Sequence, residues 1–349
     1  MIKGKSILIF GGTGSLGKKL IDRLSYSNSI SVYSRDELKQ WTLKNDLSIK
    51  GYSIEQPKFY VGDVRDYNRV KDVIRQVKPN IIILAAALKQ VDTCELSPWE
   101  SIQTNIHGTQ NVISAINDVH PKKLETVLYV STDKASSPIN TYGMCKAISE
   151  RLITSQASIE RKDNVAFVCT RYGNVLESRG SIIPLFKYQS EKNDCLTVTN
   201  PEMTRFVMTL DDSVDLISKA IVSGASGETW IPVIPSMRIG DLAELFSELS
   251  GKPIRVVGSR PGEKLHEDLI NVSEATRTRK ICDYKSSKAK NYVIEPVFST
   301  TCSREVLSYD SSMKVLTKEE LKKLLIRLNV FDMKLDQFSG QKIEEISTT

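Results

Sequence analysis

Short apolar runs alternate with longer amphipathic stretches through the first half of the chain. The apolar runs lie at 7–10, 30–33, 58–61, 81–84, 126–130 and 165–168, with amphipathic stretches between them at 16–24, 37–49, 70–77, 99–119 and 142–159. Strands of near-continuous Val, Ile and Leu are buried on both faces, and their alternation with helices is typical of a parallel, doubly wound sheet. We therefore predict an α/β fold with a Rossmann-type domain over residues 1–175.

The rhythm changes after residue 175. Shorter strands and loops follow, with helices expected at 211–223, 239–249 and 318–328. This pattern predicts a smaller α/β substrate-binding lobe over 176–331, with some later segments returning to the first domain, and a polar tail over 332–349. The Lys- and Ser-rich stretch 286–291 is expected to be a surface loop. The wider segment 277–291 carries no motif that we can assign.

Composition excludes several classes of protein. The 48 Lys and Arg against 42 Asp and Glu give a net charge of +6, which fits an anionic ligand but is too dispersed for a nucleic-acid surface. The 6 cysteines are widely separated and form neither a disulfide framework nor a metal site. The N-terminus enters a strand too early for a signal peptide or membrane span. We expect a cytoplasmic protein without a membrane partner.

A glycine motif follows the first predicted strand and opens the first predicted helix. It reads "GGTGSLG" and comprises Gly11, Thr13, Gly14, Ser15, Leu16 and Gly17. Absent side chains let the backbone approach a pyrophosphate, and the helix N-terminus supplies amide donors and a favourable dipole. A glycine cluster alone is a common turn device, but its position between strand and helix predicts a dinucleotide site.

The end of the second strand decides the choice of dinucleotide. Arg35 with Ser34 favours a 2′-phosphate, so we predict NADP rather than NAD. Asp36 is equally explained as a ribose ligand or as the N-cap of the next helix. At the following strand ends, two pairs are expected to contact the cofactor or simply to allow close packing: Asp63 with Val64, and Ala85 with Ala86.

Tyr142 and Lys146 are four residues apart on a predicted helix and therefore share a face. A phenol has a pKa of about 10, which an adjacent ammonium lowers by stabilising the anion. Thr132, at the end of the fifth strand, supplies the hydroxyl that completes such a redox site. The Tyr-x-x-x-Lys spacing is common by chance, but after a dinucleotide motif it predicts hydride-transfer chemistry.

These residues resemble a known family. The series "FGGTGSLG", "YSRDELKQ", "GDVRD", "AAALKQV", "TNIHGTQNV", "STDKA", "YGMCK", "RYGNVLESRGSIIPLF", "MTRF" and "PGEKLHE" is similar to extended short-chain dehydrogenase/reductases, and more narrowly to inverting UDP-N-acetylglucosamine 4,6-dehydratases that epimerise carbon 5. The resemblance covers about residues 5–300. It implies UDP-N-acetylglucosamine as substrate, tightly held NADP, a homo-oligomer such as a hexamer, and no metal.

The resemblance also implies the reaction. Tyr142, with Lys146 and Thr132, takes the 4-hydroxyl proton while carbon 4 is oxidised, and the ketone acidifies carbon 5. Retaining dehydratases carry an Asp-Glu pair after the threonine, whereas this chain has Asp133-Lys134. Asp133 is then the acid for the departing 6-hydroxyl and Lys134 the base at carbon 5, which requires a lowered lysine pKa. The simpler alternative is that Lys134 pairs with a substrate phosphate.

The substrate side is carried over from the resemblance residue by residue. The residues implied to bind substrate are Lys89, Asn105, Asn174, Ser178, Arg179, Ser181, Arg205, Arg260 and Glu263. Two of them, Arg205 and Arg260, are expected to clamp the diphosphate, because guanidinium offers paired donors to phosphate oxygens. Asn105 is alternatively a helix-kinking support, and His266 is expected to be structural.

Two other functions remain open. A nucleotide-sugar 4-epimerase or reductase would share Tyr142 and Lys146 but has no need of an acid–base pair at 133 and 134. A catalytically inactive NADP-sensing or RNA-associated Rossmann protein would commonly lose the tyrosine or the lysine, and both are present.

Overall fold

The computed structural model describes residues 2–52, 57–159, 164–176, 181–283, 286–299 and 308–332, without the side chains of 283 and 286–289. The chain divides into two compact units. Unit 1 comprises Met1–Tyr172, Asp211–Val233 and Ile270–Ser308, and unit 2 comprises Gly173–Leu210, Ile234–Leu269 and Tyr309–Thr349. Two segments from the second half of the chain therefore belong with the N-terminal sheet.

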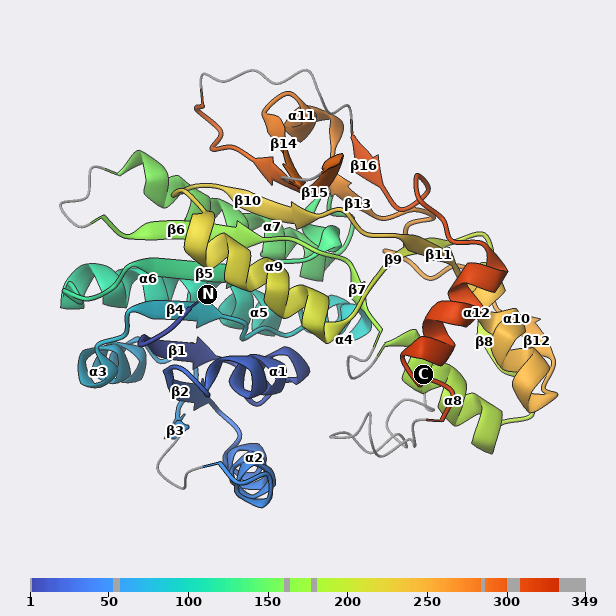
Figure 1. Cartoon of the computed structure of the whole chain (residues 1–349), viewed down its shortest axis with the longest axis horizontal. Coiled ribbons are helices and arrows are strands. Elements are labelled where there is room, and N and C mark those ends of the chain that lie inside the picture. Colours follow the sequence, from blue (N-terminus) through green and yellow to red (C-terminus); the bar gives the residue numbers. More distant parts are fainter. Residues whose placement is uncertain are drawn as a thin grey trace. The chain divides into compact units, whose positions relative to one another are not determined.

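Unit 1 is built on a nine-stranded sheet of order β14-β15-β10-β6-β5-β4-β1-β2-β3, which Figure 1 shows running from blue strands at one edge to orange strands at the other. The seven strands from β10 to β3 pair in parallel. β15 and β14 extend the sheet antiparallel. The strands are β1 (Ser6–Phe10), β2 (Ser29–Ser34), β3 (Lys58–Val61), β4 (Ile81–Leu84), β5 (Thr126–Val130), β6 (Ala166–Thr170), β10 (Thr229–Pro232), β14 (Thr278–Asp283) and β15 (Ser286–Ile294).

Both faces of the central strands are buried. On β1, Leu8 and Phe10 pack in a cluster with Val73 of α3, Ile113 of α6 and Ile153 of α7. The intervening β1 residues point to the opposite face and are also fully buried, so helices cover both sides. The helices of unit 1 are α1 (Ser15–Leu24), α2 (Glu37–Ile49), α3 (Tyr67–Val77), α4 (Val91–Leu96), α5 (Pro98–Ser101), α6 (Gly108–Val119), α7 (Thr141–Thr154), α9 (Leu210–Ser223) and α11 (Val272–Ala275), with η1 (Ile102–His107), η2 (Asp133–Ala135) and η3 (Ser155–Ser158).

Three sequence predictions of local structure were wrong. The helix expected at 99–119 is α5 and α6 joined by η1, a π-helical segment. The surface loop expected at 286–291 belongs to β15, because its backbone pairs with both β14 and β10, and pairing outweighs a weak strand propensity. The stretch 172–175, which we expected to close the sixth strand, does not do so: Asn174 starts β7 (Asn174–Val175), which pairs with another strand of unit 2.

In the residues that the structure describes, unit 2 contains three small sheets and three helices. β7 joins β9 (Thr204–Met208) and β11 (Ser236–Arg238); β8 (Leu196–Val198) pairs with β12 (Ile254–Val256); and β13 (Asp268–Ile270) pairs with β16 (Tyr309–Asp310). The helices are α8 (Ile182–Lys192), α10 (Ile239–Ser250) and α12 (Lys318–Arg327). Its core is centred on Phe186 of α8 and Phe246 of α10, whose ring centroids are 5.7 Å apart.

The packing of α1 on the loop after β1 depends on Gly17. A Cβ atom added there would lie 2.4 Å from the Gly12 Cα, a backbone atom that cannot move aside easily. Gly→Ala in a helix normally stabilises by roughly 0.5–1 kcal/mol. We expect Gly17→Ala to do the reverse and to lower the melting temperature by several degrees. Lys18→Ala, on the same turn, is the control and should change it little; equal melting temperatures for both variants would contradict this packing.

Candidate functional site

The loop after β1 is shaped for a ligand that needs close backbone approach. Gly11 has a φ of +82°, and a Cβ there would lie 2.7 Å from the backbone nitrogen of Ala86. The N-cap of α1 is Gly14, and no side chain caps the helix there. Amide donors at an uncapped helix N-terminus suit an anion, so the residues present fit the pyrophosphate of a dinucleotide.

The end of β2 is held by two short-range contacts. Asp36 accepts a hydrogen bond of 2.9 Å from the Lys39 amide, which confirms its N-cap role for α2. Ser34 is fixed by Gln40, whose Nε2 donates to both the carbonyl oxygen and the hydroxyl of Ser34 at 2.9 Å. Sequence analysis missed Gln40. The Ser34 hydroxyl keeps its own proton for donation, so it suits a phosphate oxygen.

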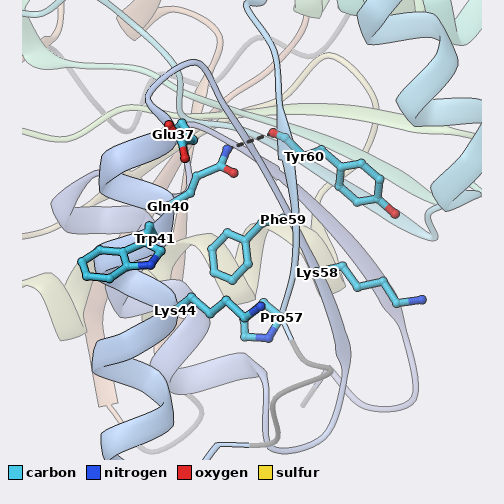
Figure 2. Close-up of a pocket in the computed structure, with 8 residues that line it drawn as sticks. All are labelled: Glu37, Gln40, Trp41, Lys44, Pro57, Lys58, Phe59 and Tyr60. Atoms are coloured by element: carbon cyan, nitrogen blue, oxygen red, sulfur yellow. Dashed lines mark hydrogen bonds between the residues drawn. The ribbon is translucent and has the colours of Figure 1, made fainter.

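The same Gln40 amide also donates to the Tyr60 carbonyl at 3.0 Å and so ties α2 to the edge strand β3 (Figure 2). A cavity of about 470 Å³ lies there, lined by Glu37, Gln40, Trp41, Lys44, Pro57, Lys58, Phe59 and Tyr60. None of the predicted site residues lines it. At the end of β3, Asp63 forms an ion pair of 2.8 Å with Arg65, so any contact with adenosine would share its carboxylate.

The acid–base pair predicted after β5 forms within one turn. Thr132 is the N-cap of η2, and its hydroxyl donates to Asp133 Oδ1 at 2.9 Å. Lys134 Nζ lies 3.2 Å from the same oxygen. The Asp133 side chain is 2% exposed and that of Lys134 is 22% exposed. The structure therefore brings a buried carboxylate and a partly accessible amine onto one shared oxygen.

Tyr142 lies in the first turn of α7 and is half-buried. Burial raises the pKa of its phenol to about 12, Lys134 lowers it, Asp133 raises it, and a hydrogen bond with Thr132 lowers it. The sequence prediction assigned this lowering to Lys146. The cation that lowers the pKa of Tyr142 is instead Lys134, so residues 132–134 and Tyr142 form one electrostatic cluster.

Lys146 is 3% exposed, and burial lowers the pKa of its ammonium to about 7. Its Nζ donates to the Val130 carbonyl at 2.5 Å and lies 4.0 Å from the centroid of the Tyr129 ring. The negative face of the ring and the carbonyl oxygen both favour the ammonium form. Lys146 is therefore anchored at the end of β5, one helical turn from Tyr142.

Asn105 lies in η1 and is 1% exposed. Its side-chain oxygen accepts from the Leu88 amide at 2.8 Å, and its Nδ2 donates to the Leu88 carbonyl at 2.9 Å. Both ends of the carboxamide thus hold the segment that carries the exposed Lys89. This geometry favours the supporting role for Asn105 over direct binding of a sugar.

A buried ion cluster beside α7 was missed by the sequence analysis. Arg171, just after β6, binds Glu150 of α7 and Glu274 of α11. The spacing of Tyr142, Lys146 and Glu150 could have indicated this cluster. The three residues follow at intervals of four, so Glu150 shares a helical face with Tyr142 and Lys146.

The predicted substrate residues Arg205, Arg260 and Glu263 lie in unit 2. The Arg205 side chain is 11% exposed, and its Nη1 donates to the backbone carbonyls of Thr204 at 2.8 Å and Leu265 at 3.2 Å, so a diphosphate would have to share these donors. Arg260 is exposed, and its amide donates to Glu263 Oε2 at 2.9 Å. His266 Nδ1 is 2.8 Å from the Thr204 hydroxyl, a structural contact.

The remaining two positions of this set that the structure describes are Asn174 in β7 and Ser181, whose hydroxyl donates to the Leu176 carbonyl at 3.2 Å. Ser178 and Arg179 lie outside the described residues. Within the described part of the chain, no group of three or more His, Cys, Asp or Glu side chains could hold a metal ion. No helix in those same ranges is long and apolar enough to cross a membrane.

The buried lysine predicts a specific dependence of stability on pH. The pKa of Lys146 is about 7 in the folded chain and about 10.4 when unfolded, so between these values the unfolded chain binds the extra proton. Stability from this group is full above pH 10.4 and is lost as the pH falls towards 7. Between pH 7 and 9.5 we expect the wild type to gain about 3 kcal/mol relative to Lys146→Met.

Urea denaturation of the protein without added cofactor, at a series of pH values, measures this difference. Lys122→Met, at an exposed position, is the control and should run parallel to the wild type. If the free energy of unfolding of Lys146→Met also followed that of the wild type in parallel across this pH range, burial would not perturb the pKa of Lys146.

Comparison with known proteins shows which family this chain resembles. A model of the polysaccharide biosynthesis protein family matches residues 7–289. A UDP-glucose 4-epimerase of Rickettsia bellii is 38% identical over 346 residues, covering 94% of this chain and 97% of that protein. The structure of Pen from Bacillus thuringiensis aligns with a TM-score of 0.84 and 33% identity, covering 94% of this chain and 98% of that one.

A dTDP-glucose 4,6-dehydratase of Streptomyces venezuelae, DesIV, solved with NAD and TYD bound, has a TM-score of 0.64 at 20% identity and covers 74% of this chain and 86% of its own. That likeness shows the shared fold and confirms the predicted Rossmann-type sheet of an extended short-chain dehydrogenase/reductase. The chain belongs to the polysaccharide biosynthesis protein family.

Proposed function

We propose that this protein is an inverting UDP-N-acetylglucosamine 4,6-dehydratase, giving UDP-2-acetamido-2,6-dideoxy-β-L-arabino-hex-4-ulose. The observation that carries the proposal is the ion pair of Asp133 and Lys134 in the cluster that contains Tyr142. Exchange of configuration at carbon 4 needs one proton acceptor, which Tyr142 supplies. Loss of the 6-hydroxyl needs a second acid and base, and this pair supplies both.

The ion pair contains the one proton that dehydration requires. Transfer of a proton from Lys134 Nζ to Asp133 Oδ1, across 3.2 Å, converts the pair into a neutral amine and a carboxylic acid. The amine then takes the carbon-5 proton, and the acid gives its proton to the departing 6-hydroxyl. Burial of Asp133 favours this neutral arrangement, because a desolvated carboxylate is costly. Inversion at carbon 5 then requires that the new proton arrive on the face opposite the amine, from a donor other than Lys134.

The residues around Tyr142 handle the proton of the 4-hydroxyl. The phenol is buried enough that its anion needs a stabilising cation and a donor, which Lys134 and Thr132 provide. A bound nicotinamide supplies the hydride acceptor at carbon 4 and the hydride donor at carbon 6. We assign NADP to this role, because Arg35 and the fixed hydroxyl of Ser34 suit a 2′-phosphate.

A second candidate is a UDP-sugar 4-epimerase. The relative from Rickettsia bellii carries that name and matches nearly the whole chain. The epimerase would use Tyr142 and Lys146 in the same way and would leave Asp133 and Lys134 as a salt bridge that orients Tyr142.

One experiment separates the two functions. The protein is incubated with UDP-N-acetylglucosamine in deuterated water, and the product is followed by NMR. Dehydration with inversion places deuterium at carbon 5, a methyl group at carbon 6 and a ketone at carbon 4. An epimer that retains the 6-hydroxyl and its carbon-5 proton would establish the epimerase instead.

The role of Lys134 is tested on the same substrate. Lys134→Gln removes the proposed base but leaves Asp133 and Tyr142, so carbon-5 exchange should slow by about 100-fold or more. Reduction of the cofactor, followed at 340 nm, should slow less, because Tyr142 is retained although it loses the cation that lowers the pKa of its phenol. Tyr142→Phe is the control and should abolish both signals. Lys134→Glu with full activity and unchanged product configuration would refute the assignment.

A further inference from the structure

In unit 1, the buried side chains of Arg171, Glu150 and Glu274 form a charged triad beside α7. Arg171 Nε donates to Glu150 Oε1 at 3.0 Å, and its Nη2 donates to Glu150 Oε2 at 2.5 Å. On its other side, Nη1 and Nη2 donate to the two oxygens of Glu274 at 2.7 Å and 2.9 Å. The three side chains are only 3%, 7% and 4% exposed. Bidentate pairing on both sides fixes the guanidinium rigidly.

The triad joins the segments that carry the reactive groups. Glu150 lies on α7, one turn after Lys146. Glu274 is the third residue of α11, and Ser136, immediately after η2, is 3.4 Å from its Oε2. A single guanidinium therefore connects the helix of Tyr142 with the turn of Asp133 and Lys134.

Charge in the triad is unbalanced. Two carboxylates face one guanidinium, which leaves one excess negative charge in a buried region. At the Glu274 end, Arg277 Nη2 lies 3.9 Å from Oε1 and offsets it. At the Glu150 end, the groups of the packed elements include Lys146, Tyr129 and Cys169, and Arg277 also interacts with Glu150; Lys146 and Arg277 can both carry positive charge. Buried carboxylates need such a partner.

We propose that Glu150, oriented by Arg171, is a positioning residue that keeps the Lys146 ammonium charged and in place for the redox step. Glu150 touches neither substrate nor cofactor in this role; it acts through Lys146. Burial lowers the pKa of Lys146 to about 7, and Glu150 is the largest of the influences that raise it. Without Arg171, the Glu150 carboxylate would be free to turn away, and its effect on Lys146 would be lost.

Glu274 provides a matched control. It is as buried as Glu150 and makes the same kind of paired contact with Arg171. It is not among the groups that act on Lys146. A purely structural triad predicts equal effects for Glu150→Gln and Glu274→Gln, whereas positioning of Lys146 predicts that only the first changes the ionisation of the lysine.

The experiment measures turnover against pH for the holoenzyme and both variants. The inference rests on the redox step of the proposed function, which a 4-epimerase would share, so UDP-N-acetylglucosamine and UDP-glucose are both assayed. We expect Glu150→Gln to move the alkaline limb of the profile down by about one pH unit, as expected for loss of a charge near an ionisable group. Glu274→Gln should leave that limb unchanged. Equal limbs in the two variants would overturn the proposal.

Two further measurements guard against misfolding and against failure of the proposed function. Glu150→Gln alone leaves Arg171 paired with Glu274 and so creates no lone buried charge, and an unchanged melting temperature checks that the variant is folded. An NMR titration of ¹³C-labelled lysine, with Lys146 assigned from Lys146→Met, reads the same pKa without any substrate. A lowered pKa there supports the proposal even if neither sugar nucleotide turns over; an unchanged one overturns it.

Discussion

Burial of the sheet on both faces is the constraint on which the rest of unit 1 depends. Because β1, β4 and β5 are covered by helices on each side, polar reactive groups have no room on their faces and gather where the strands end. The glycine loop follows β1, Asp63 follows β3, and Thr132 follows β5. Lys146 reaches this edge from α7 and is fixed by the carbonyl of Val130, the last residue of β5. Packing on both faces of the sheet therefore restricts the reactive groups to the ends of the strands.

The same burial makes charge expensive at the site, and the structure answers with paired groups. Asp133 shares one oxygen with Thr132 and Lys134, and Arg171 is held between two carboxylates. Each buried charge thus has a partner, in keeping with the cost of an isolated one. Desolvation raises the pKa of Tyr142 to about 12 and lowers that of Lys146 to about 7, so the two groups move apart in acidity. The Lys146 ammonium is then a much stronger acid than the Tyr142 phenol, and transfer of a proton from it to a Tyr142 phenolate is favoured.

Sequence periodicity predicted much of unit 1 because buried strands and amphipathic helices have strong local signals. The ranges 37–49, 58–61, 81–84 and 126–130 match α2, β3, β4 and β5 residue for residue. Periodicity failed where contacts between residues distant in sequence determine the structure. The sequence of β15 is typical of a polar loop, but this segment pairs with β14 and β10. The π-helical turn of η1 is stabilised by the hydrogen bonds between Asn105 and the Leu88 backbone. Spacing and position on the strand end pointed to Thr132 and Tyr142, whereas Asp133 and Lys134 were proposed from the family resemblance. Arg171 and Glu274 are 103 residues apart, so no local pattern could join them.

The fold and the Tyr142–Lys146 pair leave the choice of reaction open, since epimerases and dehydratases both need a single reversible oxidation at carbon 4. What distinguishes them is whether a second proton donor and acceptor stand beside the first. A lysine outside such a site would be solvated, yet Lys134 is mostly buried, bonded to an almost inaccessible carboxylate and the strongest cation acting on the phenol. A salt bridge retained only for stability gains little there, because desolvating both ions offsets their attraction. The proposed transfer of a proton between Lys134 and Asp133 would account for its position, and a dehydratase requires such a transfer.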